Sequence, residues 1–196
     1  RWRGGGMLPE RREQLYDHSV NLLLDLWQRP KLILDEKGRP HGQETNALTE
    51  LGIDTLALRR ALSQLAYEVH RDQPEEAAAA TADIPHEKLV AALRQAVPKE
   101  KRDAIPYQKI ADYVRDRAGL LEDRGEGVYG FPHRTFQEYL AAMYLLDQED
   151  FPGNIAALAR QDPARWREAA LLAGNSAPTA SQWTLVDHLY EREDAP

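Results

Sequence analysis

Apolar residues recur at helical spacing in two segments of the first half of the chain. After a glycine-rich opening, one such stripe predicts a helix from about residue 8 to Trp27, with Glu10 and Glu13 near its positive end. The stripe consists of Leu15, Ser19, Leu22, Leu23 and Leu26, broadened by Tyr16 and Val20. A second helix is predicted over residues 53–70, and its apolar face consists of Leu58, Leu62, Leu65, Ala66 and Val69.

The periodicity disappears after each of these two helices. Residues 30–50 contain Pro30, Gly38, Pro40 and Gly42, and this spacing of breakers predicts a loop that joins two domains. Residues 72–83 are acidic and rich in alanine. We expect an exposed connector there, with helical structure over residues 75–80.

Three short elements follow the connector. Residues 85–97 form a predicted helix with Leu89, Leu93 and Val97 in phase, and residues 106–118 form another. Residues 119–131 are punctuated by glycine and predict two short strands around a turn. Three helices followed by a hairpin are the element order of a winged helix. The predicted fold class is therefore mainly α, a helical bundle plus a winged-helix domain with one short β-hairpin.

The hairpin leads directly into a strongly apolar helix, predicted over residues 132–147. Its apolar face consists of Phe136, Tyr139, Leu140 and Met143, widened by Leu145 and Leu146, which predicts burial on most sides. Pro132 suits the first helical position, so we expect His133 in the first turn, beside unpaired backbone N–H groups. Such a helix end can bind phosphate. The alternative is that His133 is a capping or core-edge histidine without a ligand.

The last part of the chain predicts a further helical region. Phe151-Pro-Gly breaks the preceding helix, and residues 163–174 and 180–190 form a predicted helix pair. Two helices cannot establish a repeat period, so the residues alone do not predict a solenoid.

Composition narrows the class of protein. Hydrophobic residues make up 42% of the 196 residues, and no apolar run approaches the ~20 residues of a membrane helix. Cysteine is absent, which excludes disulfides, thiolate catalysis and Cys-ligated zinc, and which is compatible with the cytoplasm. The net charge of −7 argues against sequence-independent binding to nucleic acid.

The sequence offers no catalytic motif of its own. It contains neither a phosphate-binding P-loop nor a Gly-x-Gly-x-x-Gly dinucleotide loop. His86-Glu87 lacks the second histidine of a metalloprotease helix, so no metal site is predicted. The other histidines show no spacing typical of ligands, and we expect surface or core-edge positions for them: His18, His41, His70 and His188.

A winged helix raises the alternative of a DNA-binding transcriptional regulator. The predicted recognition helix, residues 105–118, carries Lys109, Arg115 and Arg117 against Asp112 and Asp116. The predicted wing carries three acidic residues, and its one basic residue is Arg124. This charge distribution disfavours DNA, so no DNA partner and no membrane partner are expected. A structural helical adaptor is the other alternative.

The segment from Tyr129 to Leu146 resembles a signature of NACHT-type signalling NTPases, the STAND class that includes bacterial defence ATPases and NOD-like receptors. In that family the pattern Phe-x-His-x-Thr/Ser-Phe-Gln-Glu-Tyr/Phe-x-Ala-Ala closes the winged-helix domain. Twelve consecutive positions, Phe131 to Ala142, follow it. Residues 8–27 are also similar to the end of the first helical domain in bacterial members of the family.

The resemblance implies a domain organisation. Residues 1–35 would end helical domain 1, residues 36–50 would be a linker, and residues 51–147 would form the winged-helix domain. Residues 148–196 would begin a second helical or superhelical region. A nucleotide-binding domain would precede them in the same chain and would hold most of the site for ATP or ADP with Mg²⁺.

The resemblance also implies a mechanism. His133 would sense ADP by donating a hydrogen bond to its β-phosphate in the resting state. Exchange for ATP, prompted by an unknown trigger ligand, would release the winged helix and permit homo-oligomerisation. The implied role is cytoplasmic defence signalling, in bacteria most often against phage. The full-length parent would be an ATPase, although this segment lacks a P-loop.

Overall fold

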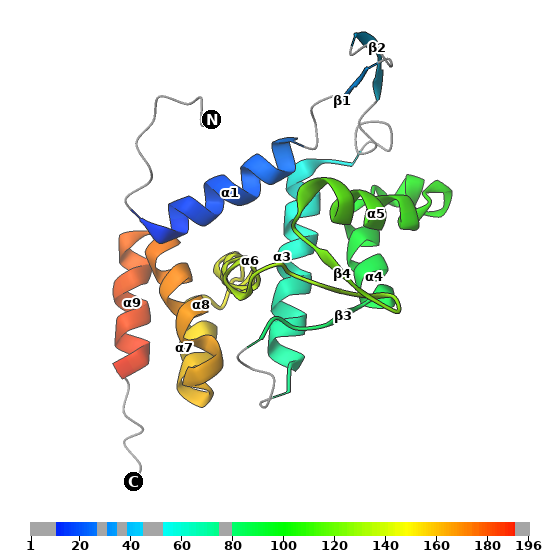
Figure 1. Ribbon diagram of the computed structural model, residues 1–196. Helices are drawn as coiled ribbons and strands as arrows, with labels where there is room; N and C mark the ends of the chain where they lie inside the picture. The colour runs from blue at the N-terminus through cyan, green and yellow to red at the C-terminus, as the bar shows by residue number, and fades with distance from the viewer. Residues whose placement is uncertain (1–10, 27–30, 35–38, 45–52, 75–79, 191–196) are drawn as a thin grey trace.

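A computed structural model of the chain describes residues 11–26, 31–34, 39–44, 53–74 and 80–190 (Figure 1). These residues are mainly helical, with two small antiparallel sheets, as the predicted fold class requires. The elements in chain order are α1 (Arg12–Leu26), β1 (Lys31–Leu34), β2 (Pro40–Glu44), α3 (Thr55–Asp72), β3 (Ile84–Pro85), α4 (His86–Ala96), η2 (Lys99–Ala104), α5 (Tyr107–Ala118), β4 (Glu122–Gly125), β5 (Val128–Gly130), α6 (Arg134–Leu146), α7 (Gly153–Gln161), α8 (Pro163–Ser176) and α9 (Thr179–Tyr190).

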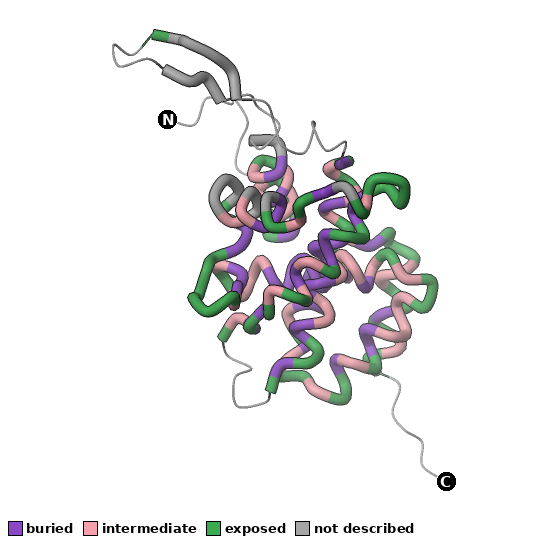
Figure 2. The backbone as a smooth tube through the Cα atoms, turned by 90° about the vertical axis from the view of Figure 1, so that its right-hand side faces the viewer, coloured by how far each residue is buried: buried purple, intermediate pink, exposed green. Residues whose placement is uncertain are grey.

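Helices α3 and α6 form the centre of the molecule (Figure 2). The side chain of Asp54 caps α3 by accepting a hydrogen bond from the Leu56 amide. The predicted apolar face of α3 is buried along its whole length. Helix α6 is buried on most sides, as predicted, and its Ala141 and Ala142 are both fully buried. Such small side chains allow neighbouring helices to approach closely.

The winged-helix part consists of α3, α4, α5 and a three-stranded sheet. The predicted hairpin is β4–β5, and its turn contains Glu126 and two glycines at positive φ. The unpredicted strand β3 pairs with β5 through Ile84 and Tyr129, which gives the order β3-β5-β4. Sequence periodicity could not indicate β3, because the strand has two residues and the second is a proline.

Helix α1 packs with only part of the predicted apolar face. Its buried residues are Glu13, Val20 and Leu24, whereas Leu15 and Leu22 of the predicted stripe are 41% and 43% exposed. The helix is confirmed, and its predicted face is partly right: Tyr16, Val20 and Leu23 pack on the core, but Leu15 and Leu22 do not. Periodicity could not indicate the polar contacts that α1 also makes with other helices.

Two further elements differ from the sequence prediction. The predicted loop at residues 30–50 contains an antiparallel pair, in which Lys31 lies opposite Glu44 in β1 and β2. Helix α7, whose buried residues are Ile155, Ala156 and Ala159, follows directly after the break at Pro152. The predicted break between helices is confirmed, but a helix that was not predicted begins directly after it. The predicted pair that follows is confirmed as α8 and α9, which pack with α7.

The sequence also predicts a helical segment in the acidic connector and no membrane-spanning helix. The helical segment predicted in the acidic connector falls on residues 75–79, outside the described residues. Among the described helices, none is both long and apolar enough to cross a bilayer.

Candidate functional site

His133 lies at the N-terminal end of α6, two helical positions earlier than predicted. Its backbone is extended, with φ −137° and ψ 139°, so it is the N-cap residue and Pro132 precedes the helix. The His133 carbonyl accepts a hydrogen bond from the Phe136 amide at 3.0 Å. The imidazole makes no capping hydrogen bond and is exposed to solvent. A capping role through the side chain is therefore not observed.

Aromatic rings connect His133 with α1. The imidazole lies nearly parallel to the Phe136 ring, with 6.3 Å between ring centroids and 19° between planes. The Phe136 ring meets Tyr16 edge-on at 6.0 Å, and Tyr16 lies 5.7 Å from the Tyr139 ring. The exposed histidine consequently stands at the end of a row of rings that leads into the core.

A polar cluster of Asp17, Asn21, Arg59 and Tyr139 joins α1, α3 and α6. The Arg59 guanidinium donates to Asp17 Oδ1 at 2.6 Å, to Asn21 Oδ1 at 2.6 Å and to the Tyr139 hydroxyl at 2.8 Å. The Tyr139 hydroxyl in turn donates to Asp17 Oδ1 at 2.9 Å. This cluster adds polar contacts to the face of α1 that also buries Val20 and Leu24.

The surroundings fix the protonation states of this cluster. Burial alone would raise the pKa of Asp17, but hydrogen bonds from Arg59 and Tyr139 lower it below its ordinary value. Burial raises the pKa of Tyr139 well above that of a free tyrosine. Burial would lower the pKa of Arg59, but the hydrogen bond to Asp17 and the charge beside it raise it. The cluster is therefore an ion pair bridged by a neutral phenol.

Gln137 occupies a second polar cluster on the other side of α6. Its Oε1 accepts from the Ala82 amide at 2.8 Å, and its Nε2 lies 2.9 Å from His70 Nδ1. The other ring nitrogen of His70, Nε2, lies 3.1 Å from the Arg165 carbonyl. Because the amide N–H of Ala82 must donate, Gln137 donates to Nδ1 and His70 carries its proton on Nε2.

His70 is thus a buried structural histidine, which corrects the predicted surface or core-edge position. It is 1% exposed. Burial lowers its pKa to about 4, and the nearby cations Arg134 and Arg165 act in the same direction. Exposed His18 and half-buried His188 match the expectation, and the side chain of His41 lies outside the described residues.

Glu138 is also buried, beside Arg134 of the same helix. The Arg134 Nε lies 2.6 Å from Glu138 Oε1. Burial raises the pKa of Glu138, although the Arg134 charge opposes that rise. Gln137, Glu138 and Tyr139 of the signature therefore have structural partners inside the protein. The sequence patterns did not predict these roles. The presence of three polar residues within an otherwise apolar helix was the feature that could have indicated them.

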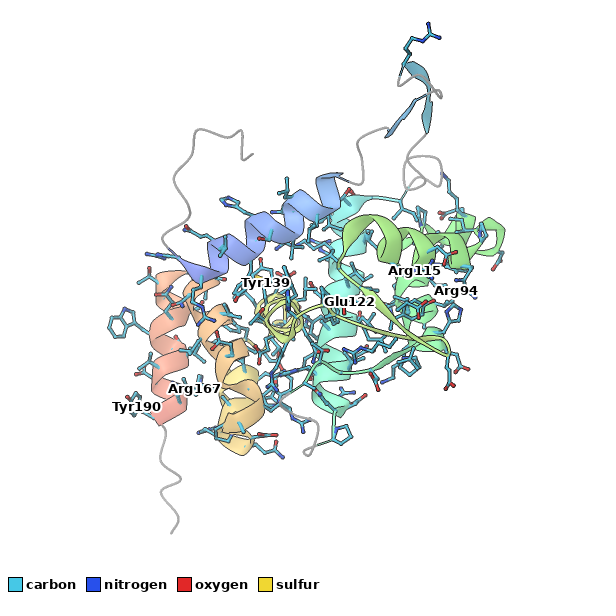
Figure 3. All side chains as sticks on the ribbon, viewed as in Figure 1. Arg94, Arg115, Glu122, Tyr139, Arg167 and Tyr190 are labelled. Carbon is cyan, nitrogen blue, oxygen red and sulfur yellow. The ribbon has the colours of Figure 1, made fainter. Side chains whose placement is uncertain are left out.

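The basic side chains around the wing are paired with carboxylates. Arg124 binds Asp83 at 2.5 Å and the hydroxyl of Thr81, and its guanidinium lies over Gly130. Arg115 of α5 lies 3.3 Å from both Asp112 and Asp123 (Figure 3). The side chains of Lys109 and Arg117 lie outside the described residues. Phosphate groups of DNA would have to compete with these carboxylates.

The order of helices and strands from α3 to α6, with β5 between β3 and β4, defines a winged helix-turn-helix domain. A family model described as a winged helix-turn-helix domain C-terminal to NACHT matches residues 12–145. This match covers more than half of the chain, and the chain belongs to that family. Comparison with curated proteins and with solved structures gave no match.

Membership of this family is consistent with a NACHT domain upstream in the same chain. The division into domains at residues 35, 50 and 147 stays a prediction, as does the nucleotide contact of His133. Among the described residues, no group of three or more His, Asp and Glu side chains is arranged to hold a metal ion.

Proposed function

We propose that this chain is the regulatory C-terminal half of a NACHT-type STAND ATPase, whose winged helix responds to the bound nucleotide. The family match supports the class of protein. The observation that carries the sensing role is His133, an exposed imidazole at the N-terminal end of a helix that is otherwise almost wholly buried.

The chemistry of this helix end suits a phosphate. The first amides of α6 lie at the positive end of the helix dipole, where an anion is stabilised. The imidazole of His133 makes no capping hydrogen bond, so its N–H can donate to an incoming oxygen. Three other polar residues of the signature, Gln137, Glu138 and Tyr139, are occupied within the core. Within residues 131–142, His133 is the one exposed side chain, which supports it as the group that meets a ligand.

The proposed switch has two states. In the resting state the winged helix would lie against the upstream NACHT domain, where His133 donates a hydrogen bond to the β-phosphate of ADP. ATP or ADP with Mg²⁺ would be held mainly by that upstream domain. A ligand shifts such an equilibrium only through its different affinity for the two states. A hydrogen bond to a charged phosphate, worth about 1.5–3 kcal/mol, supplies such a difference.

Release of the winged helix would then permit homo-oligomerisation and signalling. The proposed setting is cytoplasmic defence, in bacteria against phage, with a trigger ligand acting elsewhere in the parent protein. The connection from His133 through Phe136 and Tyr16 to α1 supports coupling to the preceding domain, because α1 is the part of the family match nearest to it in sequence.

The substitution His133→Ala in the parent protein tests this proposal. Loss of a contact worth ~1.5–3 kcal/mol in the closed state changes the closed-to-open ratio by roughly one to two powers of ten. We expect faster ADP release, measured with a fluorescent ADP analogue, and an unchanged melting temperature. His18→Ala, at an exposed histidine on α1, is the matched control and should change neither quantity.

Leu140→Ala supplies a second control, because Leu140 is fully buried in α6 and its truncation lowers stability. If His133→Ala lowers the melting temperature as Leu140→Ala does, while ADP release stays at the wild-type rate, His133 is structural and the sensing proposal is wrong.

A further inference from the structure

Helix α9 carries an apolar face that the rest of the described chain does not cover. Leu185 is buried, but Trp183 is 67% exposed and Tyr190 is 81% exposed. Around the helix, Val186 and Leu189 lie between Leu185 and the two aromatic residues, and both are exposed. At 100° per residue, these positions form one continuous arc of roughly 160°. Helix α9 lies at the outer edge of the molecule, beside α8 (Figure 1).

The arc borders an apolar groove of about 410 Å³ between α8 and α9. On α8 the groove is lined from Pro163 to Asn175, which is roughly 18 Å of helix at 1.5 Å per residue. Leu171 lines it and is 50% exposed. An apolar groove of this length between two helices can receive a third helix.

The width of the arc indicates which partner supplies the third helix. The groove is lined by Leu185, Val186 and Leu189 of α9, whereas Trp183 and Tyr190 lie on the far flank of the arc, outside the lining. A single helix placed in the groove would leave both aromatic side chains in water. A second copy of the chain, related by a two-fold axis, places its own α9 in the groove and its α8 against that flank.

Charge supports the same partner. Arg167 is the charged residue in the groove lining, and Asp187 is exposed on the flank of α9 beside Trp183. Within the described part of the chain, neither residue forms an ion pair. In a two-fold arrangement Asp187 of each copy faces Arg167 of the other, so the interface contains the same ion pair twice. Figure 3 shows Arg167 and Tyr190 on the α8–α9 side of the molecule.

We propose that the α8–α9 face is a self-association surface, through which two copies of this chain form a four-helix bundle. At ~200 Å² for a fully exposed aromatic side chain, Trp183 and Tyr190 of both copies would contribute roughly 600 Å², before the aliphatic residues are counted. Stable interfaces bury ~1,200–2,000 Å², so these aromatic side chains would supply roughly a third to a half of the area that a stable dimer needs. The inference goes beyond the proposed function, because this dimer needs neither nucleotide nor the NACHT domain.

Sedimentation equilibrium of the 196-residue chain, from low to high micromolar concentration and without nucleotide, tests the proposal. We expect a monomer–dimer equilibrium that is lost in the double variant Trp183→Ser, Val186→Ser. Arg167→Asp and Asp187→Arg should each weaken association by roughly ten-fold, and the double charge swap should restore it. The variant Leu15→Ser, Leu22→Ser removes the exposed leucines of α1 and should associate as the wild type does.

Circular dichroism melting of each variant confirms that the chain is folded. A chain that stays monomeric at every concentration overturns the proposal and leaves the face to a different partner. So does a dimer that the Trp183 and Val186 substitutions leave unchanged, or one that the charge swap fails to restore. These results concern α8 and α9 alone, so they are distinguishable from a failure of the His133 experiment.

Discussion

Inside the core, the orientation of the Gln137 side chain determines which ring nitrogen of His70 carries the proton. The amide of Ala82 orients the Gln137 side chain, Gln137 fixes the tautomer of His70, and His70 donates to the carbonyl of Arg165. Each group would be costly to bury without its partner. The chain of contacts thereby connects α3, the segment before β3, α6 and α8.

This arrangement makes stability depend on pH below neutrality. The pKa of His70 is about 4 in the folded chain, whereas an unfolded histidine titrates near 6.5. Because the folded value is lowered, the contribution of neutral His70 is complete above pH 6.5 and is lost as the pH falls towards 4. The loss is on the order of 2–3 kcal/mol. Urea unfolding between pH 7 and pH 4.5 should show it.

The variant His70→Gln isolates this effect, because glutamine has no charge to gain. Glu138 acts in the opposite direction, since its raised pKa favours the folded state at lower pH, but it is present in both proteins. We expect the wild type to lose more stability than His70→Gln over this range. Parallel pH profiles for the two proteins would show that His70 is not buried in its neutral form.

At the scale of elements, α1 is held by polar contacts as well as by its buried residues Val20 and Leu24. Asp17 accepts hydrogen bonds from Arg59 and Tyr139, and Glu168 of α8 binds Arg12 at 2.6 Å. The outward residues Leu15 and Leu22 contribute little to that attachment.

Asp17→Ala should therefore loosen α1 from the rest of the molecule. The substitution leaves Arg59 half-buried without its carboxylate, which costs about 1.5–3 kcal/mol. Hydrogen–deuterium exchange should show faster exchange over residues 12–26 and little change in α8 and α9. His18→Ala, one position along the same helix, should exchange as the wild type does. Uniformly faster exchange across the whole chain would contradict a local role for the cluster.

The wing offers few cations to DNA. Arg124 is bound to Asp83 and Thr81, and Arg115 to Asp112 and Asp123. We therefore expect no binding of duplex DNA at physiological salt in a mobility-shift titration. Asp83→Ala with Asp123→Ala, which removes one carboxylate partner from each arginine, should bind more strongly than the wild type at low salt. Sub-micromolar binding by the wild type, weakening steeply with salt, would favour a DNA-binding regulator.

Sequence patterns predicted the elements better than their contacts. Leu58, Leu62 and Val69 identified α3 and its buried face, because an apolar stripe is removed from water only when that face packs against the rest of the protein. The same reasoning did not distinguish Leu15 and Leu22 of α1, which are exposed, from Val20, which is buried beside the contacts of Asp17. The position of His133 on the helix was predicted to within two residues. The partners of Gln137 lie 55 and 67 residues away, and no local pattern encodes such distances.

At the scale of the whole molecule, the chain combines a winged helix with a following helical unit and lacks a P-loop in its sequence. The 196-residue chain alone should neither hydrolyse ATP nor bind ADP tightly, because the proposed site lies mainly in the upstream domain. Titration calorimetry with ADP and Mg²⁺ measures this directly. Micromolar affinity in the isolated chain would place the nucleotide site here instead.

The two polar clusters of α6 also limit how this helix can move. Gln137 and Tyr139 are two residues apart, so they leave the helix axis about 200° from each other. Gln137 is bonded to His70 of α3 and to the Ala82 amide, and Tyr139 to Arg59 of α3 and Asp17 of α1. Rotation of α6 about its own axis would break both sets of bonds together. A displacement of the helix at His133 would therefore reach Leu146, ~20 Å away, without rotation about the helix axis.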